Sequence, residues 1–306
     1  MKTTNMHDKD KISTTLKASN KAYASQSTIR SIHDAIAHTV SQFGDSDDSR
    51  RLHRVPTGFS EYDQKTGGLA VGKLTAIIGK PTMGQHILSM DIARHAAAEG
   101  VASLIISQMS INEICMRIIS AETGMEMENL EPNIKLDGDE RSILDAYYSF
   151  CENMPLYFMP NYYGTVKQIK KACRSLKKHI NLKLVVINGV SCITKDPANL
   201  PKAMPELARL ARELDIAVVF TASIRTFPFQ GNRRPDLNYI TDGAALRCHA
   251  DTILIVHRRN PSDETENTNE TKNTSETELI LAQHPWLSTC TFNLRFQPEY
   301  SRFTDH

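Results

Sequence analysis

Five short, mainly apolar runs, separated by stretches with helical spacing, are the feature that most restricts how this chain can fold. Nearly continuous apolar runs are typical of strands covered on both faces, and helices between such strands connect them in parallel. The expected strands are 74–78, 101–106, 182–187, 216–221 and 252–256. The expected helices are 85–98, 111–120, 166–179 and 207–214. The pattern predicts an α/β fold with a mainly parallel central sheet flanked by helices, in which ligands bind at the carboxyl ends of the strands.

The two ends of the chain and one internal stretch differ in composition from this pattern. Residues 1–27 are rich in Ser, Thr, Lys and Asn, so we expect a disordered tail. In 28–54 a short amphipathic helix over 28–43 precedes a polar linker, and this arm either folds back on its own domain or docks on a neighbouring subunit. The α/β domain is expected over 55–306. Within it, 261–278 carries six acidic residues, one lysine and no large apolar residue, which predicts a flexible insert.

Charge and hydropathy exclude some classes of protein. No apolar run approaches the roughly 20 residues that span a bilayer, and the amino-terminal residues lack the apolar core of a signal peptide. A cytoplasmic protein without a membrane partner is therefore expected. The six cysteines form no C-x-x-C pair, so we interpret them as reduced thiols. The net charge of +1 does not exclude a polyanionic partner, because a sum hides how charges are distributed.

A glycine-rich turn follows the first expected strand. A phosphate loop has the pattern GxxxxGK[ST]: its backbone N–H groups hold phosphates, its lysine contacts them, and its hydroxyl binds Mg²⁺. Gly79 and Gly84 have this spacing, but Gln85 stands at the lysine position and His86 at the hydroxyl position. The sequence therefore predicts a vestigial phosphate loop. Its members are Gly79, Lys80, Pro81, Thr82, Met83, Gly84, Gln85 and His86.

Several further blocks occur in a fixed order around this loop. They are TGFSEYDQKTGGL (57–69), SQMS (107–110), LVVINGVS (184–191), LARELDIAVVF (210–220) and Ala250-Asp251. Together with the loop they resemble the ATPase domain of DnaB-type replicative helicases, which has a RecA-like P-loop NTPase fold. The resemblance extends from Val55 to the hairpin that ends at Phe303, and the 28–43 helix falls where the family has its linker helix. The family's N-terminal primase-binding domain has no counterpart in this sequence.

The resemblance implies ATP and Mg²⁺ as cofactors and assigns a role to each position of the site. The phosphate-binding lysine of the family falls on Gln85 and its Mg²⁺-binding threonine on His86. The glutamate that activates the attacking water falls on Gln108, so this catalytic position is expected to be inactive. The Walker B aspartate falls on Asn188, which makes Asn188 a doubtful metal ligand. The glutamine that follows the γ-phosphate falls on Ala222.

The groups that the family supplies from a neighbouring subunit are changed as well. The trans-acting K-x-R pair falls on Gln283 and Pro285, and an arginine of a further block falls on Thr241. A charge-assisted contact to phosphate is worth about 1.5–3 kcal/mol, so loss of the lysine alone weakens binding about ten- to hundredfold. A general base contributes about 10²–10⁴-fold and an arginine finger about 10³–10⁵-fold. We therefore expect weak nucleotide binding or none, and little or no hydrolysis. Rescue by Lys80, or a metal site that includes His86, are the alternatives.

A second candidate surface is the helix expected over 166–179, which carries six cations and no acidic residue. Their helical spacing predicts one basic face, either a solvated outer face or a surface that contacts phosphates. These cations are Lys167, Lys170, Lys171, Arg174, Lys177 and Lys178. The resemblance also places three arginines in loops that face single-stranded DNA in the family. The candidate nucleic-acid-binding residues are Arg225, Arg233, Arg234, Lys170, Arg174 and Lys177.

These expectations combine into one leading hypothesis and two alternatives. The leading hypothesis is a helicase-domain protein of DNA replication with a degenerate ATP site. It would act as a structural or regulatory partner of a helicase ring, or of single-stranded DNA, and would join helicase subunits or copies of itself through the 28–43 helix. The first alternative is an active 5′–3′ replicative helicase whose catalytic residues have been relocated. The second is a separate DNA-binding module that uses the basic helix.

Overall fold

The computed structural model describes residues 54–131, 134–194, 196, 199–223, 234–237, 243–258 and 276–306, together with Ile32 and Ile36. The chain divides into two units, Met1–Leu52 and His53–His306. In the first unit both described residues are helical and exposed. The predicted tail and the rest of the 28–43 helix lie outside the described residues, as does 261–275 of the predicted insert. The insert boundary at 278 is wrong, because residues 276–278 already belong to a strand.

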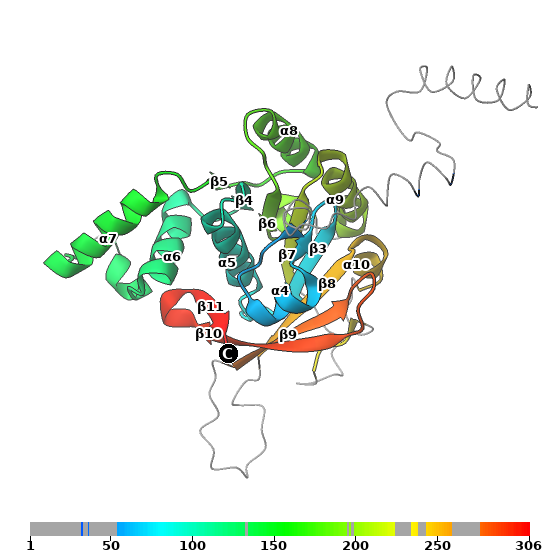
Figure 1. Ribbon diagram of the computed structural model, residues 1–306. Coiled ribbons are helices and arrows are strands. Elements are labelled where there is room, and N and C mark those ends of the chain that lie inside the picture. The colour runs from blue at the N-terminus through cyan, green and yellow to red at the C-terminus, as the bar shows by residue number, and fades with distance from the viewer. Residues whose placement is uncertain are drawn as a thin grey trace, which may run out of the picture. The chain divides into compact units, whose positions relative to one another are not determined.

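The second unit is built on one large sheet (Figure 1). The parallel strands are β3 (Leu74–Gly79), β4 (Ser103–Ser107), β5 (Leu156–Met159), β6 (Leu184–Asn188), β7 (Ala217–Ser223) and β8 (Thr252–Arg258). The antiparallel strands are β9 (Glu276–Gln283), β10 (Cys290–Gln297) and β11 (Arg302–Asp305). Within the described residues the order is β11-β10-β9-β8-β3-β7-β6-β4-β5. β1 (Arg54–Val55) and β2 (Leu69–Ala70) form a separate antiparallel pair.

Helices cover both faces of this sheet (Figure 1). The α-helices of the described part are α4 (Ser60–Thr66), α5 (Gln85–Ala98), α6 (Ile111–Thr123), α7 (Gly138–Cys151), α8 (Val166–Lys177), α9 (Leu200–Leu214) and α10 (Gly243–His249). Short 3₁₀ turns occupy Met127–Leu130, Val190–Cys192 and Pro298–Tyr300. Because successive strand residues point to opposite faces, Ile78 packs in the cluster beneath α8 and α9, whereas Ile77 packs in the cluster beneath α5 and α6. None of these helices is long and apolar enough to cross a membrane.

The predicted α/β fold with a mainly parallel sheet is confirmed. The five predicted strands form β3, β4, β6, β7 and β8, and the predicted helix 85–98 has the bounds of α5. The largest differences are that α9 begins at Leu200 rather than at residue 207 and that α6 extends to Thr123 rather than to residue 120. The other predicted boundaries of these strands and helices differ by no more than two residues. The sequence pattern did not predict α4, α7, α10 or the edge strand β5.

The last strand packs directly behind the glycine-rich loop. The ring of Phe303 in β11 lies 4.7 Å from that of Phe296, and a Cβ atom on Gly84 would lie 2.8 Å from the Phe303 Cζ atom. Gly84 also has a φ of +89°, which side chains rarely adopt. The backbone N–H of Phe303 donates to Asp91 Oδ2 at 2.7 Å in α5. Only glycine fits at position 84, because packing by β11 fills the space behind it.

The side chain of Asp91, which accepts the Phe303 N–H, is buried beside two other ionisable groups. Arg94 Nη2 donates to Asp91 Oδ1 at 3.0 Å, and Arg94 Nη1 contacts the Glu122 carboxylate. Burial raises the pKa of Asp91 to about 6, although Arg94 and the Phe303 N–H oppose this shift. His95 lies 3.4 Å from Arg94 Nη2 through its Nε2 atom. Asp91 therefore links α5 to β11 through a carboxyl group whose proton affinity is raised.

Candidate functional site

The carboxyl ends of four neighbouring parallel strands meet at one edge of the sheet. Gly79 pairs with Ser223, Asn188 pairs with Thr221, and the residue before Gln108 pairs with Asn188. The loop, Gln108 and Asn188 were singled out from separate parts of the sequence. Parallel pairing brings them to a common edge, which is where ligands bind in open α/β sheets.

The glycine-rich loop joins β3 to α5 at this edge. Thr82 has a φ of 70°, and the Met83 N–H donates to the Lys80 carbonyl at 3.2 Å, which makes the turn compact. Met83 is buried, whereas Pro81 and Thr82 are exposed. Arg258 Nη2, from the end of β8, donates to the Thr82 carbonyl at 2.8 Å. The loop thus keeps the tight turn and the helix amino terminus that can bind an anion.

Gln85, at the expected lysine position, is turned into the protein. It is 4% exposed, and its Nε2 atom donates to Ser223 Oγ at 2.9 Å at the end of β7. Its Oε1 atom has no partner and lies 3.3 Å from the point where a Cβ of Gly79 would be. The side chain therefore bridges the loop to the next strand and lies against the first glycine. It carries no charge with which to hold a phosphate.

Asn188, at the Walker B position, is tied to its neighbours by hydroxyl groups. Its Oδ1 atom accepts hydrogen bonds from Ser89 Oγ at 2.6 Å and from Thr221 Oγ1 at 3.5 Å. Its Nδ2 atom is buried without a partner. Since two hydroxyls already occupy the amide oxygen, it offers neither charge nor a free oxygen to a cation.

Gln108 and His86 are the other two predicted site residues at this edge of the sheet. Gln108 follows β4, and its Nε2 atom is buried without a hydrogen-bond partner. His86 is partly buried, and burial, followed by the nearby Arg117 guanidinium, holds the pKa of its imidazole below the ordinary value. His86 is therefore neutral near pH 7. An amide and a neutral imidazole replace the carboxylate and hydroxyl that the resemblance leads one to expect.

The residues at these positions do not fit a bound Mg²⁺ ion. Magnesium sites in nucleotide-binding proteins use carboxylate or hydroxyl oxygens, whereas this edge presents two glutamines, an asparagine and a histidine. In the described part of the chain, no group of three or more His, Cys, Asp or Glu residues could hold a metal ion. The backbone of a phosphate-binding turn is kept, but the side chains that would make the site cationic and metal-binding are replaced.

The two positions of the trans-acting pair lie at the opposite ends of the strands. Gln283 Nε2 donates to the Ala250 carbonyl at 2.8 Å and to the Arg247 carbonyl at 3.2 Å, so it caps the end of α10. Pro285 is exposed and carries no polar side chain. Gln283 therefore joins β9 to the end of α10 within this chain. Neither position provides a cation.

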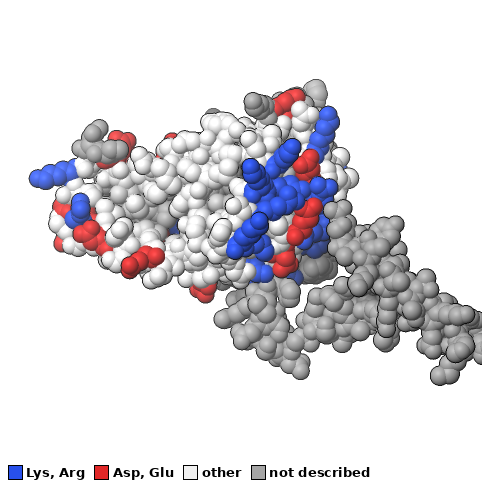
Figure 2. Space-filling model, turned by 90° about the horizontal axis from the view of Figure 1, so that it is seen from above, with Lys and Arg blue, Asp and Glu red and all other residues white. Residues whose placement is uncertain are grey.

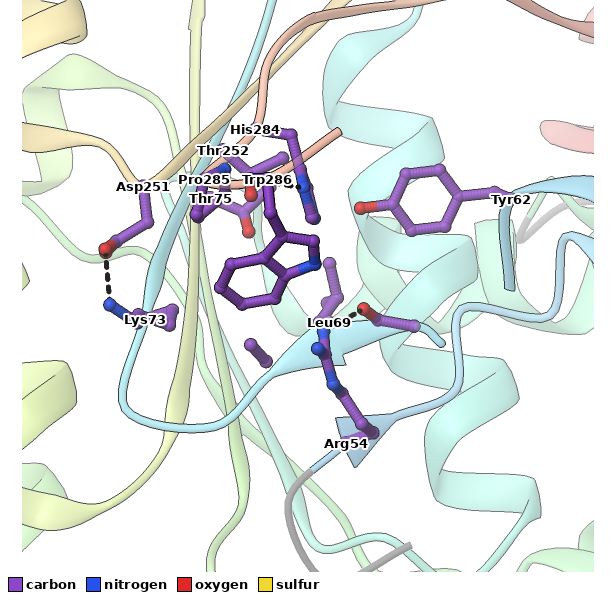
Figure 3. Close-up of a pocket in the computed structure, with 12 residues that line it drawn as sticks. Arg54, Tyr62, Leu69, Lys73, Thr75, Asp251, Thr252, His284, Pro285 and Trp286 are labelled. Atoms are coloured by element: carbon purple, nitrogen blue, oxygen red, sulfur yellow. Dashed lines mark hydrogen bonds and ion pairs between the residues drawn. The ribbon is translucent and has the colours of Figure 1, made fainter. Parts of the chain in front are cut away.

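A small cavity lies beside Pro285 (Figure 3). Lys73 Nζ and Asp251 Oδ1 pair at 2.8 Å on one side of it, and Arg54 lies 5.6 Å from the centre of the Trp286 ring on the other. The Asp251 carboxylate also accepts the Leu74 N–H at 3.0 Å. The Ala250-Asp251 block thus joins the starts of β3 and β8.

The basic helix differs from its prediction at two of its six cations. Lys170 does not share the exposed face: it is 5% exposed and its Nζ atom lies 3.6 Å from Glu213 Oε2 in α9. Lys177 donates to two backbone carbonyls, those of Leu182 and Asp215, at 3.2 Å each. Arg174 is half exposed and pairs with Glu213 at 2.8 Å. The carboxylate of α9 draws Lys170 inward because α8 packs against α9.

Of the three loop arginines, the structure describes Arg234. Its Nε atom pairs with Glu278 Oε2 at 3.1 Å and its Nη2 atom contacts Thr291 Oγ1, which ties it to β9 and β10. Arg225, Arg233 and Thr241 lie outside the described residues. Ala222 is buried inside β7. The role of these residues in DNA binding stays a prediction.

Comparison with known proteins identifies relatives of this unit. Residues 54–305 match the family described as "DnaB-like helicase C terminal domain". The chain is 29% identical over 260 residues to the replicative DNA helicase DnaB of Leifsonia xyli, covering 82% of this chain and 56% of that protein. It is 25% identical over 297 residues to the replicative DNA helicase DnaC of Bacillus subtilis, covering 91% and 63%. The chain thus spans roughly 60% of the length of these curated relatives.

Solved structures agree on the fold. A solved ATPase domain superposes with a TM-score of 0.78 at 21% identity, covering 91% of this chain and 99% of that one. A DnaB-like replicative helicase, described together with its interactions with primase, superposes with a TM-score of 0.74 at 18% identity, covering 98% and 76%. The predicted RecA-like fold and the predicted family resemblance are confirmed.

Proposed function

Because this chain belongs to the DnaB-like helicase C-terminal domain family, we propose that it is a helicase-domain protein of DNA replication whose ATP site no longer hydrolyses ATP. It acts as a structural or regulatory partner of a helicase ring. The observation that carries this proposal is the state of the loop edge. Gln85 and Asn188 are hydrogen-bonded within the chain, and Gln108 carries an amide where a general base is needed.

The size of the expected defect supports the same conclusion. Loss of a phosphate-binding lysine weakens binding about ten- to hundredfold, and loss of a general base lowers the rate about 10²–10⁴-fold. These effects are not additive, but each acts on a different part of the reaction. A site that has lost both retains almost no catalysis.

A partner is supported by an apolar surface that the described unit leaves uncovered. None of the residues of α7 is buried, and Ile143, Tyr148 and Phe150 on this helix are 43%, 82% and 58% exposed. In the amino-terminal unit Ile32 and Ile36 are exposed as well. Exposed apolar groups of this size are typical of interaction surfaces. The 28–43 helix is proposed to join this chain to helicase subunits or to further copies of itself.

A nucleotide titration with and without Mg²⁺, together with an ATPase assay in single-stranded DNA, tests the enzymatic part. The expected result is weak or absent nucleotide binding that Mg²⁺ does not strengthen, and no hydrolysis. Hydrolysis that Lys80→Ala abolishes and Gln85→Ala leaves intact would overturn the pseudoenzyme proposal.

Co-purification with a full-length DnaB-type helicase tests the structural part. Deletion of residues 28–43 is expected to abolish it, and Ile32→Asp with Ile36→Asp to weaken it strongly. Lys65→Asp, an exposed change in the other unit, is the matched control and is expected to leave it intact. Equal recovery of all four proteins contradicts the ring-partner role.

One observation favours a second function, that of an active 5′–3′ helicase with relocated residues. Arg258 reaches the loop at the Thr82 carbonyl, and Lys80 lies inside the loop. These cations could supply the charge that Gln85 lacks, but neither replaces the carboxylates lost at Gln108 and Asn188. Arg258→Ala combined with Lys80→Ala removes any activity of this kind.

A further inference from the structure

A row of side chains runs along the outer face of α8. We call Tyr163, Lys167, Lys171, Arg174 and Lys178 the α8 stripe. The four cations are separated by three or four residues, which are neighbours on one face of a helix, and Tyr163 lies three residues before α8 begins at Val166. All five are exposed, and Tyr163, just before the helix, is 66% exposed. The helix rise of 1.5 Å per residue gives the four cations a length of about 16 Å.

The charges of this surface are only partly neutralised. Residues 163–183 contain seven Lys and Arg residues and no Asp or Glu. Glu213 is shared, since it contacts Lys170 at 3.6 Å, Arg174 at 2.8 Å and Arg209 at 3.0 Å. Figure 2 shows Lys and Arg side chains gathered on one part of this view with only a few acidic side chains between them.

Three members of the stripe are not neutralised by a carboxylate in the described part of the chain. Among the described residues, Lys167, Lys171 and Lys178 have no ion pair. The whole chain has a net charge of +1, so this surplus is a local concentration rather than a general property. Surface cations concentrated in this way attract polyanions.

The loop that carries Tyr163 is held firmly. The N–H groups of Asn161 and Tyr162 donate to the carbonyls of Met109 and Ser107 at 2.9 Å each, on either side of Gln108. The Thr165 and Gln168 side chains form a capping box at the start of α8. The backbone on both sides of the exposed Tyr163 is thus held in place at the amino-terminal end of α8.

We propose that the α8 stripe binds single-stranded nucleic acid, with Lys167, Lys171, Arg174 and Lys178 on successive phosphates and Tyr163 stacked on a base. A basic track combined with an aromatic platform is the chemistry that binds single strands without reading their sequence. A duplex offers phosphates but no unstacked base, and an acidic protein offers no base at all. The aromatic ring at the end of the track therefore favours a single strand.

This inference deepens the DNA-partner part of the proposed function and uses a surface apart from Arg234, the loop arginine that the structure describes. α8 connects β5 to β6, whereas Arg234 contacts β9 and β10, beyond β7, β3 and β8 in the sheet order. It also replaces two of the candidates drawn from the sequence. Lys170 is buried against Glu213 and the half-buried Lys177 donates to backbone carbonyls, while Lys167, Lys171 and Lys178 are exposed.

Fluorescence anisotropy with labelled oligothymidylate of about 20 nucleotides tests the charges. The triple variant Lys167→Gln, Lys171→Gln, Lys178→Gln is expected to weaken binding about tenfold or more. It should also reduce the slope of log affinity against log salt by about 2, because each phosphate contact on a single strand contributes about 0.7. The matched control is Lys65→Gln, Lys135→Gln, Arg141→Gln, which removes the same charge from exposed positions elsewhere. An equal loss in both triples, or no binding by the unaltered protein at low salt, overturns the proposal.

Tyr163→Ala tests the single-strand part. Stacking is worth about 1–3 kcal/mol per base, so oligothymidylate binding is expected to fall about 5- to 150-fold. Heparin, which has no bases, should bind the variant and the unaltered protein equally. If Tyr163→Ala leaves both probes unaffected, or if polyglutamate binds more tightly than the oligonucleotide, the single-strand assignment is wrong.

The two proposals can fail separately. The stripe variants are expected to leave co-purification with a helicase and the absence of ATP hydrolysis unchanged. Loss of oligonucleotide binding in the control triple would contradict only the proposal that the α8 stripe binds a single strand. Hydrolysis of ATP by the unaltered protein would sink only the proposed pseudoenzyme.

Discussion

The loop edge and the α8 stripe belong to the same unit, yet they differ in charge. At the loop edge, Gln85, Gln108 and Asn188 are neutral and two of them are hydrogen-bonded to neighbouring strands and helices. On α8, lysines accumulate on the exposed side with one shared carboxylate, Glu213, to balance them. The comparison teaches that the fold does not depend on the chemistry of its ligand site. A RecA-like domain can lose charge at one surface and carry it at another.

The largest expected effect is on the free energy of unfolding, and it tests whether the packing of Phe303 stabilises the loop edge. Phe303→Ala removes a buried ring that packs behind Gly84, so the free energy of unfolding should fall by about 3–5 kcal/mol. Phe150→Ala, at an exposed position of α7, is the control and should cost less than about 0.5 kcal/mol. Urea denaturation measures both. Equal stabilities would mean that packing by β11 does not support the loop.

The next effect concerns the carboxyl group below that contact. Because burial raises the pKa of Asp91 to about 6, the folded protein holds a proton that the unfolded chain releases near pH 4. This contribution to stability is present at low pH and is lost as pH rises from about 4 to about 6, by up to about 3 kcal/mol. Asp91→Asn lacks this titration. Unfolding measured across this range should therefore show the unaltered protein losing stability relative to the variant.

Burial lowers the pKa values of His86 and His95, but both histidines are present in the two proteins, so the difference isolates Asp91. Arg94, Glu122 and His95 are the ionisable groups around it. A relative stability that rises with pH would mean instead that the ion pair with Arg94 outweighs burial.

Restoring charge at the loop edge would sharpen the comparison. The combined change Gln85→Lys, Gln108→Glu, Asn188→Asp should raise nucleotide affinity about ten- to hundredfold in the presence of Mg²⁺. Oligonucleotide binding through the α8 stripe should stay the same. A control with Gln64→Lys and Asn293→Asp changes exposed residues only. If restored charges leave the affinity unchanged, the turn itself has lost the geometry that binds phosphate.

The smallest effect concerns Glu213, the carboxylate that partly neutralises the α8 stripe. The pairs of Glu213 with Arg174 and Arg209 are at the surface and contribute little. Most of the loss of stability in Glu213→Gln, about 1 kcal/mol, is therefore expected from Lys170, which is 5% exposed and loses its carboxylate partner. The variant should raise oligonucleotide affinity a few fold and steepen the salt slope by about 0.7, since one more cation becomes available. Glu128→Gln, an exposed residue elsewhere, is the control. Unchanged affinity would indicate that Arg174 does not contact the nucleic acid.

The central strands could be predicted from sequence because they are buried on both faces. Leu74–Ile78 and Leu184–Ile187 contain no polar residue other than Thr75, so few alternatives exist. α7 was not predicted although Ile143, Tyr147 and Cys151 recur at helical spacing. None of its residues is buried in the described unit, so the strand–helix alternation of the core did not include it. β5 was missed because it is a short, half-buried edge strand.

The positions of the candidate site could be predicted, but not their contacts. The glycine spacing located Gln85, whereas its partner Ser223 depends on the pairing of β3 with β7. On α8 the helical spacing indicated a basic face but placed Lys170 on its outer side. Burial of Lys170 depends on Glu213 of the next helix, and no pattern within α8 contains that information.

The contact between Phe303 and α5 has a consequence for how the protein is made. The two residues joined by the Phe303 N–H and the Asp91 carboxylate are 212 positions apart. During synthesis the turn at Gly84 emerges long before the Phe303 ring that packs behind it. One side of α5 therefore stays uncovered in the nascent domain until β11 has been synthesised. Contacts of such long range form late and slow the folding of a domain. The growing chain would therefore expose Phe296 and the buried side of α5 until β11 arrives, which makes this domain a candidate client of chaperones that act during translation.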